Sequence, residues 1–186
     1  MSRLRKIYVL SAVFILTAFA AACQGELKKA NQLVEEGNAA VAEALRLAAE
    51  GDSKLNQLVG GMANFPAGRD QLKAPSQEIL GLLDKAVAKL REAEKKFADA
   101  SKLDVEAPYK EYLSVKSQEY GKHAEHLDVL KGIPNTLTDP SVQDGDAARE
   151  KFVTIKERVE KLQKEWTDLA ARADKIYQEN KDKFKS

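Results

Sequence analysis

The chain has 186 residues, a formal net charge of +1, and 6% aromatic residues. A charge balance this close to zero lacks the basic excess of a nucleic-acid-binding protein, so we expect no nucleic-acid partner. The single cysteine excludes an intramolecular disulfide, so the fold must depend on core packing.

The first 23 residues have the layout of a signal segment that ends at the only cysteine. Arg3, Arg5 and Lys6 precede the uncharged run IYVLSAVFILTAFAAA, and Cys23 follows directly. A cationic start, an apolar centre and small residues at a cleavage point are typical of a secretory signal peptide. The apolar run is shorter than the roughly 20 residues that a membrane-spanning helix needs.

The sequence AAAC at residues 20–23 resembles the lipobox of bacterial lipoprotein precursors. In that family the cysteine thiol receives a diacylglycerol, the peptidase cuts before the cysteine, and the new amine is usually acylated. The resemblance implies removal of residues 1–22 and a lipid anchor at Cys23 of the mature chain, residues 23–186. Gln24 is not the Asp that the family uses for inner-membrane retention, which implies the periplasmic face of the outer membrane in a Gram-negative cell. Ordinary secretory cleavage and an uncleaved N-terminal anchor are the alternatives.

Four amphipathic helices are predicted after this segment, at residues 26–59, 75–102, 108–131 and 146–182. Good helix formers dominate the composition, and Pro- and Gly-containing stretches separate the helices. The first helix repeats apolar residues every seven positions, and Gly51 is a candidate break within it. Its second heptad row consists mostly of small residues, which lets a neighbouring helix approach closely: Ala30, Gly37, Ala44, Gly51 and Leu58.

The other three helices each carry one apolar stripe with steps of four and three residues. The stripe of the second helix runs from Ile79 to Ala100, that of the third from Tyr109 to Leu130, and that of the fourth from Ala148 to Asn180. Helices with one stripe each bury them by packing inward, so we expect an all-α, antiparallel four-helix bundle in a single domain. In that arrangement the loops at residues 63–75 and 131–146 share the end far from the lipid anchor.

Those two distal loops are the predicted partner-binding surface. Apolar groups on proline-stiffened loops lose little entropy on binding, and basic Arg69 stands in the first loop. The alternative is that these side chains fold back and cap the end of the helices. The residues concerned are Phe65, Arg69, Ile133 and Leu137.

The third helix carries the one metal-like group. Glu119, His123 and His126 fall on one helical face, but no second half of a di-iron motif and no haem-attachment motif is found. We therefore expect no metal or haem cofactor. Lys116 places a charge on the apolar stripe beside Tyr120, and its ammonium either reaches solvent or marks a polar cavity.

Neither a catalytic triad nor a glycine-rich phosphate loop is recognisable, so we expect no enzyme activity. The predicted function is a membrane-anchored, extracytoplasmic binding or scaffolding module of the bacterial envelope, with another envelope protein as its partner. The only attached group expected is the diacylglycerol and N-acyl lipid at Cys23. The alternative function is a small-ligand, metal or haem-binding bundle with its site near Lys116, Tyr120, His123 and His126.

Overall fold

The computed structural model describes residues 2–60 and 65–184, with side chains described from residue 25 onward. Its elements are α1 (Ser2–Gly60), α2 (Arg69–Ser101), α3 (Ala107–Leu130), α4 (Gly132–Thr138) and α5 (Gly145–Asn180). The regular secondary structure of the described residues is therefore all helical, as the sequence predicts, with no strand among them. Cys23 and the rest of the lipobox lie outside the residues whose side chains are described.

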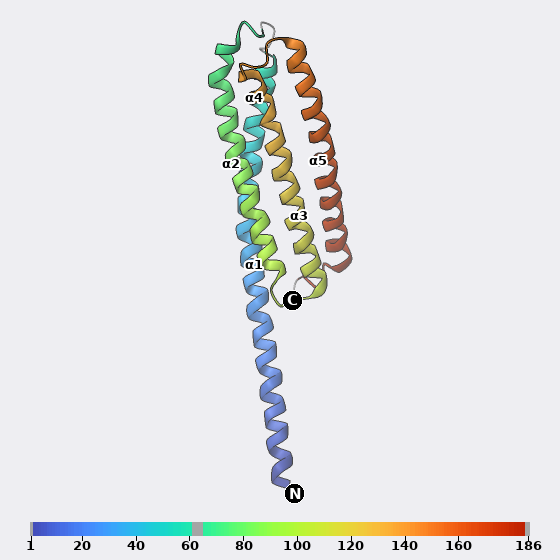
Figure 1. The fold of residues 1–186 in the computed structure, drawn as a ribbon. Helices are drawn as coiled ribbons and strands as arrows, with labels where there is room; N and C mark the ends of the chain where they lie inside the picture. Colours follow the sequence, from blue (N-terminus) through green and yellow to red (C-terminus); the bar gives the residue numbers. More distant parts are fainter. Residues whose placement is uncertain (1, 61–64, 185–186) are drawn as a thin grey trace.

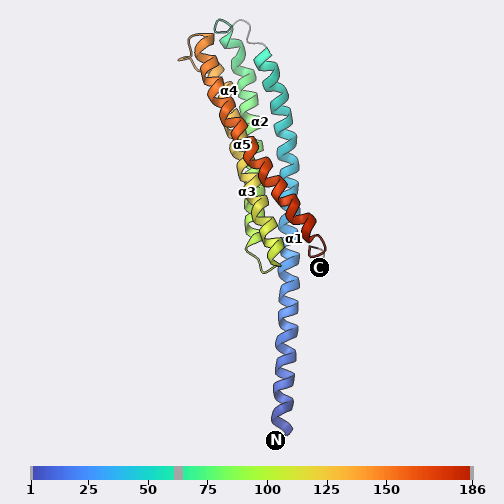
Figure 2. The ribbon, with the colours of Figure 1, turned by 90° about the vertical axis from the view of Figure 1, so that its right-hand side faces the viewer.

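The four long helices lie side by side, and the N-terminal part of α1 projects beyond the others (Figure 1). The α1–α2 and α4–α5 connections lie at one end of the molecule. The α2–α3 connection and the C-terminus lie at the other end, beside the projecting part of α1 (Figure 1). In the orthogonal view α5 crosses the face of α3 diagonally and diverges from α1 toward the α4 end (Figure 2).

Helix α2 occupies the centre of the core, and its predicted stripe is confirmed in full. It packs against both α1 and α3. Because α2 has neighbours on two sides, every residue of the stripe is buried: Ile79, Leu83, Ala86, Leu90, Ala93, Phe97 and Ala100.

The predicted start of this helix, at residue 75, is wrong by six residues, since α2 begins at Arg69 and contains Pro75. A proline this near the N-terminus removes one backbone hydrogen bond without ending the helix. Because proline favours the first turn of a helix, the prediction placed the start of the helix at Pro75.

Helix α1 ends at Gly60, one residue from the predicted end, and it does not break at Gly51. Its predicted start at residue 26 differs from the structure, because the helix is continuous from Ser2. The small-residue row is buried along its whole length, as the heptad pattern predicts. A Cβ added at Gly37 would lie 2.7 Å from Cε2 of Phe97, so the glycine permits the close approach of α1 and α2.

Helices α3 and α5 lie within two residues of their predicted bounds. Asp144 caps α5 by accepting a 2.8 Å hydrogen bond from the amide of Ala147. Most of the α5 stripe is only half-buried, because α5 packs mainly on one long helix, α3. The fully buried side chains of α5 are few: Ala148, Ala173 and Ile176.

Helix α4 is absent from the sequence prediction, which assigned residues 131–146 to a loop. Pro134 stands in its first turn, where a missing N–H is tolerated. The hydroxyls of Thr136 and Thr138 donate to the carbonyls of Gly132 and Pro134. The Gly, Pro and Thr residues of this segment favour a turn, so the sequence predicted a loop. The short apolar pattern becomes helical only through tertiary packing.

None of the helices searched, over the residues with described side chains, combines the length and apolar character needed to cross a membrane.

Candidate functional site

Lys116 and Glu119 form a partly buried ion pair one turn apart on α3. The ammonium Nζ lies 2.7 Å and 2.9 Å from the two carboxylate oxygens. Nζ also lies 4.5 Å from the centre of the Tyr120 ring, a cation–π contact. The side chains of Lys116 and Glu119 are 17% and 9% exposed, so α3 itself supplies the partner that the partly buried ammonium needs.

Burial governs the ionisation of this pair. Burial raises the pKa of Glu119, and the hydrogen bond and charge of Lys116 partly oppose that rise. For Lys116, burial acts to lower the pKa, but the hydrogen bonds with Glu119 and Tyr120 reverse the effect and raise it. The hydrogen bonds within the pair therefore offset part of the cost of burying its two side chains.

The two histidines are turned toward different neighbours. His123 stacks on Trp166 of α5, with ring centroids 4.6 Å apart and planes 10° from parallel. His126 lies 6.0 Å from His123 and lines an apolar cavity of about 250 Å³ between α1, α2 and α3. Burial, with a smaller contribution from His126, lowers the pKa of His123 to about 4. Burial also lowers the pKa of His126, so both rings are neutral at pH 7.

The structure does not bring Glu119, His123 and His126 together as metal ligands. The carboxylate of Glu119 is held by Lys116, and His123 is stacked on Trp166. Over residues 25–60 and 65–184, no group of three or more His, Cys, Asp or Glu side chains has the arrangement of a metal site. Helical spacing placed the three on one face, but their side chains point to separate partners.

The side chains of the predicted partner-binding loops pack against the distal end of the helices. Leu137 is fully buried, and Phe65 and Ile133 pack partly buried against the main core. The guanidinium of Arg69 donates to the carbonyl of Val142 and lies 5.2 Å from the centre of the Phe65 ring. These side chains cap the helices, which is the alternative that the sequence left open.

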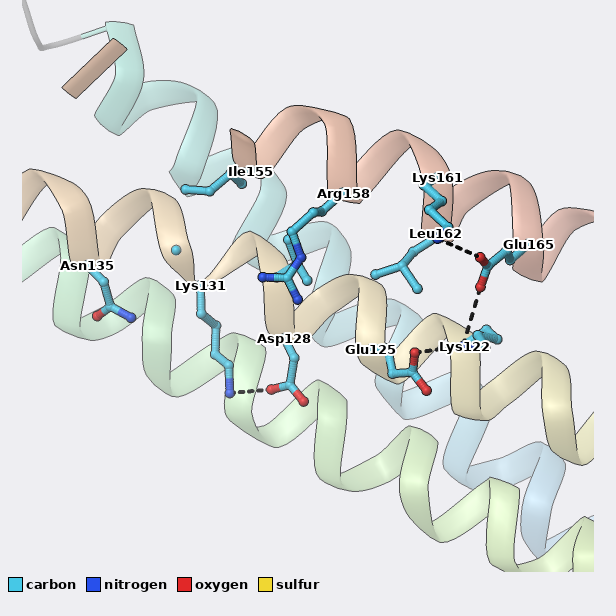
Figure 3. A pocket seen from close by; sticks show the side chains of 12 residues that line it. Lys122, Glu125, Asp128, Lys131, Asn135, Ile155, Arg158, Lys161, Leu162 and Glu165 are labelled. Atoms are coloured by element: carbon cyan, nitrogen blue, oxygen red, sulfur yellow. Dashed lines mark hydrogen bonds and ion pairs between the residues drawn. The ribbon is translucent and has the colours of Figure 1, made fainter. Parts of the chain in front are cut away.

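A groove between α3 and α5 is the candidate functional site that the structure adds. It has a volume of about 730 Å³ and lies along the last turns of α3, the start of α4 and the first half of α5 (Figure 3). Gly132 makes the close contact at its α4 end possible, because an added Cβ would lie 2.8 Å from Cδ1 of Ile155. Aliphatic groups from both sides contribute to the lining: Val129, Ile155 and Leu162.

Ion pairs neutralise most of the charge in the groove. Lys122 bridges Glu125 at 2.9 Å and Glu165 at 3.3 Å. At the other end, Lys131 bridges Asp128 at 2.5 Å and Asp84 at 2.7 Å. All three carboxylates that line the groove are therefore already held by lysines.

Arg158 is the exception among the cations of α5. Each of the other seven cations of this fully described helix forms an ion pair with a carboxylate. Arg158 has no hydrogen bond or ion pair with the described residues, and its guanidinium is turned into the groove toward α3 (Figure 3). The sequence already indicated the missing ion pair, because no Asp or Glu stands three or four positions from Arg158. Only the structure shows that a groove faces it.

The chain matches no protein-family model, and neither a curated protein nor a solved structure is significantly similar to it. The functional argument therefore rests on the geometry of the chain itself.

Proposed function

We propose that this protein is a membrane-anchored, extracytoplasmic lipoprotein of the bacterial envelope that acts by binding rather than catalysis. The binding site in this proposal is the groove between α3 and α5. The observation that carries it is the groove itself, because the other polar clusters are internally paired and the distal end is capped. The proposal includes an antiparallel four-helix bundle, supported by connections that lie at alternate ends of the molecule (Figure 1).

The anchor and the groove would lie at opposite ends of the helices. Leu27 is the first described side chain that packs against the core, only four residues after Cys23. A lipid at Cys23 would therefore hold the helices close to the membrane, without a long tether. The groove lies in the α4 half of the molecule, away from the projecting N-terminal part of α1, and would face outward from the lipid surface (Figure 1).

Two kinds of binding partner fit the proposal, another envelope protein and a small ligand. The groove volume favours the small ligand, since about 730 Å³ falls in the range of roughly 300–1,000 Å³ that is typical of small-molecule sites. The lining combines three aliphatic side chains with eight polar or charged ones, which fits a ligand that has both an apolar and a polar part. The small-ligand function predicted near Lys116 thus moves to a neighbouring face of α3.

Metabolic labelling tests the anchor. Cells that produce the full chain are given an alkyne-bearing fatty acid, and the protein is examined for label and for membrane association. We expect the native chain to be labelled and membrane-bound, and Cys23→Ala to lose both properties. A Cys23→Ala protein that still incorporates the fatty acid would show that the lipoprotein proposal is wrong.

Native mass spectrometry tests the groove. The full chain is purified from its own membranes in mild detergent, and its mass is compared with two variants. Val129→Trp fills the groove, whereas Val153→Trp adds the same bulk on the outer face of α5, where Val153 is 52% exposed. We expect a bound mass that Val129→Trp loses and Val153→Trp keeps, and the size of that mass distinguishes a small ligand from a protein. An identical result for both variants would contradict binding in the groove.

A further inference from the structure

We propose that the groove between α3 and α5 binds a small amphiphilic carboxylate, with the carboxylate on Arg158 and the aliphatic part along the groove. This inference deepens the proposed function and rests on its choice of the groove as the binding site. It assigns the chemical class of the ligand.

The charge of the ligand follows from which groups in the groove are free. Lys122 and Lys131 each bridge two carboxylates, and Lys161 lies 3.9 Å from Glu165. The groove carboxylates are therefore neutralised from inside, and a cationic ligand would find no free partner among them. Arg158 remains as the unneutralised charge that faces the groove (Figure 3). A ligand that pairs with this free guanidinium carries a negative charge.

The geometry of a guanidinium further narrows the chemical class of the ligand's head group. A planar guanidinium offers parallel N–H donors that match the two oxygens of a carboxylate, and such paired hydrogen bonds are stronger than neutral ones. Inorganic phosphate and phosphate monoesters carry more than one negative charge at pH 7, which a single guanidinium does not balance. The carboxylate is therefore the head group that the groove fits best.

The aliphatic part follows from the neighbours of Arg158 on its own helix. Ile155 and Leu162 stand three positions before and four positions after Arg158, which places all three side chains on one face of α5. Val129 completes the apolar lining from α3. A carboxylate held at Arg158 would place an attached alkyl group against these side chains, where burial is favourable.

The test uses three small probes with the full chain, labelled with ¹⁵N and held in detergent micelles. Sodium hexanoate has the proposed head and tail, hexanamide has the tail without the charge, and inorganic phosphate has an anionic head without the tail. Binding is followed by two-dimensional amide spectra. We expect hexanoate to shift the amides of Val129, Ile155 and Leu162 in a saturable way. Hexanamide and phosphate should each bind with an affinity at least about tenfold lower.

Two matched variants identify the cation. Arg158→Gln removes the proposed contact, and Arg149→Gln makes the same change on α5 at a site that is paired with Asp146 and is outside the groove lining. We expect hexanoate binding to fall at least tenfold in Arg158→Gln and to stay unchanged in Arg149→Gln. The far-ultraviolet spectra of both variants should match that of the native chain, because both side chains are exposed.

The inference would be overturned by equal binding of hexanoate and hexanamide, by undiminished binding in Arg158→Gln, or by phosphate binding as tightly as hexanoate. Absence of saturable hexanoate shifts would overturn it as well. If native mass spectrometry still finds a bound mass that depends on Val129, the groove remains the binding site and only the carboxylate class is wrong. A protein-sized bound mass would instead replace the small acid by a docking segment of another envelope protein.

Discussion

The imidazole of His123 lies flat on the indole of Trp166, and this contact joins α3 to α5. It is a neutral stack, because burial first and the nearby His126 second lower the pKa of His123 to about 4, from an ordinary value of 6.5. The indole Nε1 and His126 Nδ1 are both buried without a hydrogen-bond partner among the described residues. The junction between the two helices is thus held by the packing of uncharged rings.

Acidification should therefore weaken the fold. A folded-state pKa below the unfolded value means that the unfolded chain takes up the proton first, so stability is complete above about pH 6.5 and declines toward pH 4. We expect a loss of about 1–2 kcal/mol, less than the full shift implies, because the ring is only partly buried. Thermal melts of the full chain followed by circular dichroism at pH 7, 6 and 5 measure this decline.

Two histidine variants separate the contributions to that decline. The raised pKa of Glu119 acts in the opposite direction, so the comparison must be made between variants. His123→Gln should remove most of the decline, whereas His126→Gln should remove less, since His126 contributes less to the junction with α5. An unchanged pH dependence in His123→Gln would show that the stack with Trp166 is not the acid-sensitive element.

Glycine substitutions should have opposite effects at two helix positions. Gly37→Ala places a Cβ 2.7 Å from the fully buried Phe97 ring, so we expect a net destabilisation of about 1–2 kcal/mol despite the better helix propensity of alanine. Gly81→Ala on α2 meets nothing within 4 Å and should stabilise by up to about 1 kcal/mol. Urea unfolding of both variants measures the two changes. A stabilised Gly37→Ala would mean that α1 and α2 pack less closely than described.

Removing one partner of the Lys116–Glu119 pair should cost more stability than removing both. Glu119→Leu leaves the ammonium of Lys116, 17% exposed, without its carboxylate, and should destabilise by about 2–3 kcal/mol. The double variant Lys116→Met with Glu119→Leu should recover most of that loss, because no isolated charge remains. Denaturant unfolding curves compare the single and double variants. Equal losses in both would indicate that the pair contributes through packing alone.

The distal cap should prove structural. Leu137→Ala removes a fully buried side chain and should lower the free energy of unfolding by about 2–4 kcal/mol. Ile133→Ala, at a partly buried position of the same helix, should cost less. Thermal unfolding of the two variants measures the difference. A negligible effect of Leu137→Ala would restore the interpretation of this end as a recognition surface.

The helical periodicity of the sequence was sufficient to predict the buried residues of helices that have neighbours on two sides. The stripe from Ile79 to Ala100 is buried throughout because α1 and α3 both cover α2. The α5 stripe has the same spacing, yet residues such as Leu162 and Trp166 stay half-buried. Periodicity identifies the apolar face of a helix, but how many neighbours cover that face is decided by tertiary packing.

The candidate site was harder to predict for the same reason. His123 and Lys116 stood out because they interrupt an apolar stripe, but each has a local partner, Trp166 or Glu119. Arg158 was not among the predicted site residues, since an arginine beside the apolar stripe of an amphipathic helix is ordinary. Its assignment to the candidate site depends on the absence of a carboxylate partner and on the groove that forms where α5 crosses α3. Both are properties of the assembled chain.

The thin attachment of α5 implies that the protein does not open as one unit. Most of the buried side chains belong to a core shared by α1, α2 and α3, whereas α5 contributes to a small separate cluster with Val115, Ala173 and Ile176. Segments with few buried contacts open at lower free energy than the whole fold, so α5 should behave as a distinct foldon. Its central amides would then exchange with deuterium well before those of α2. A ligand that spans the groove would bridge this foldon to α3, and binding would be registered as slower exchange along α5.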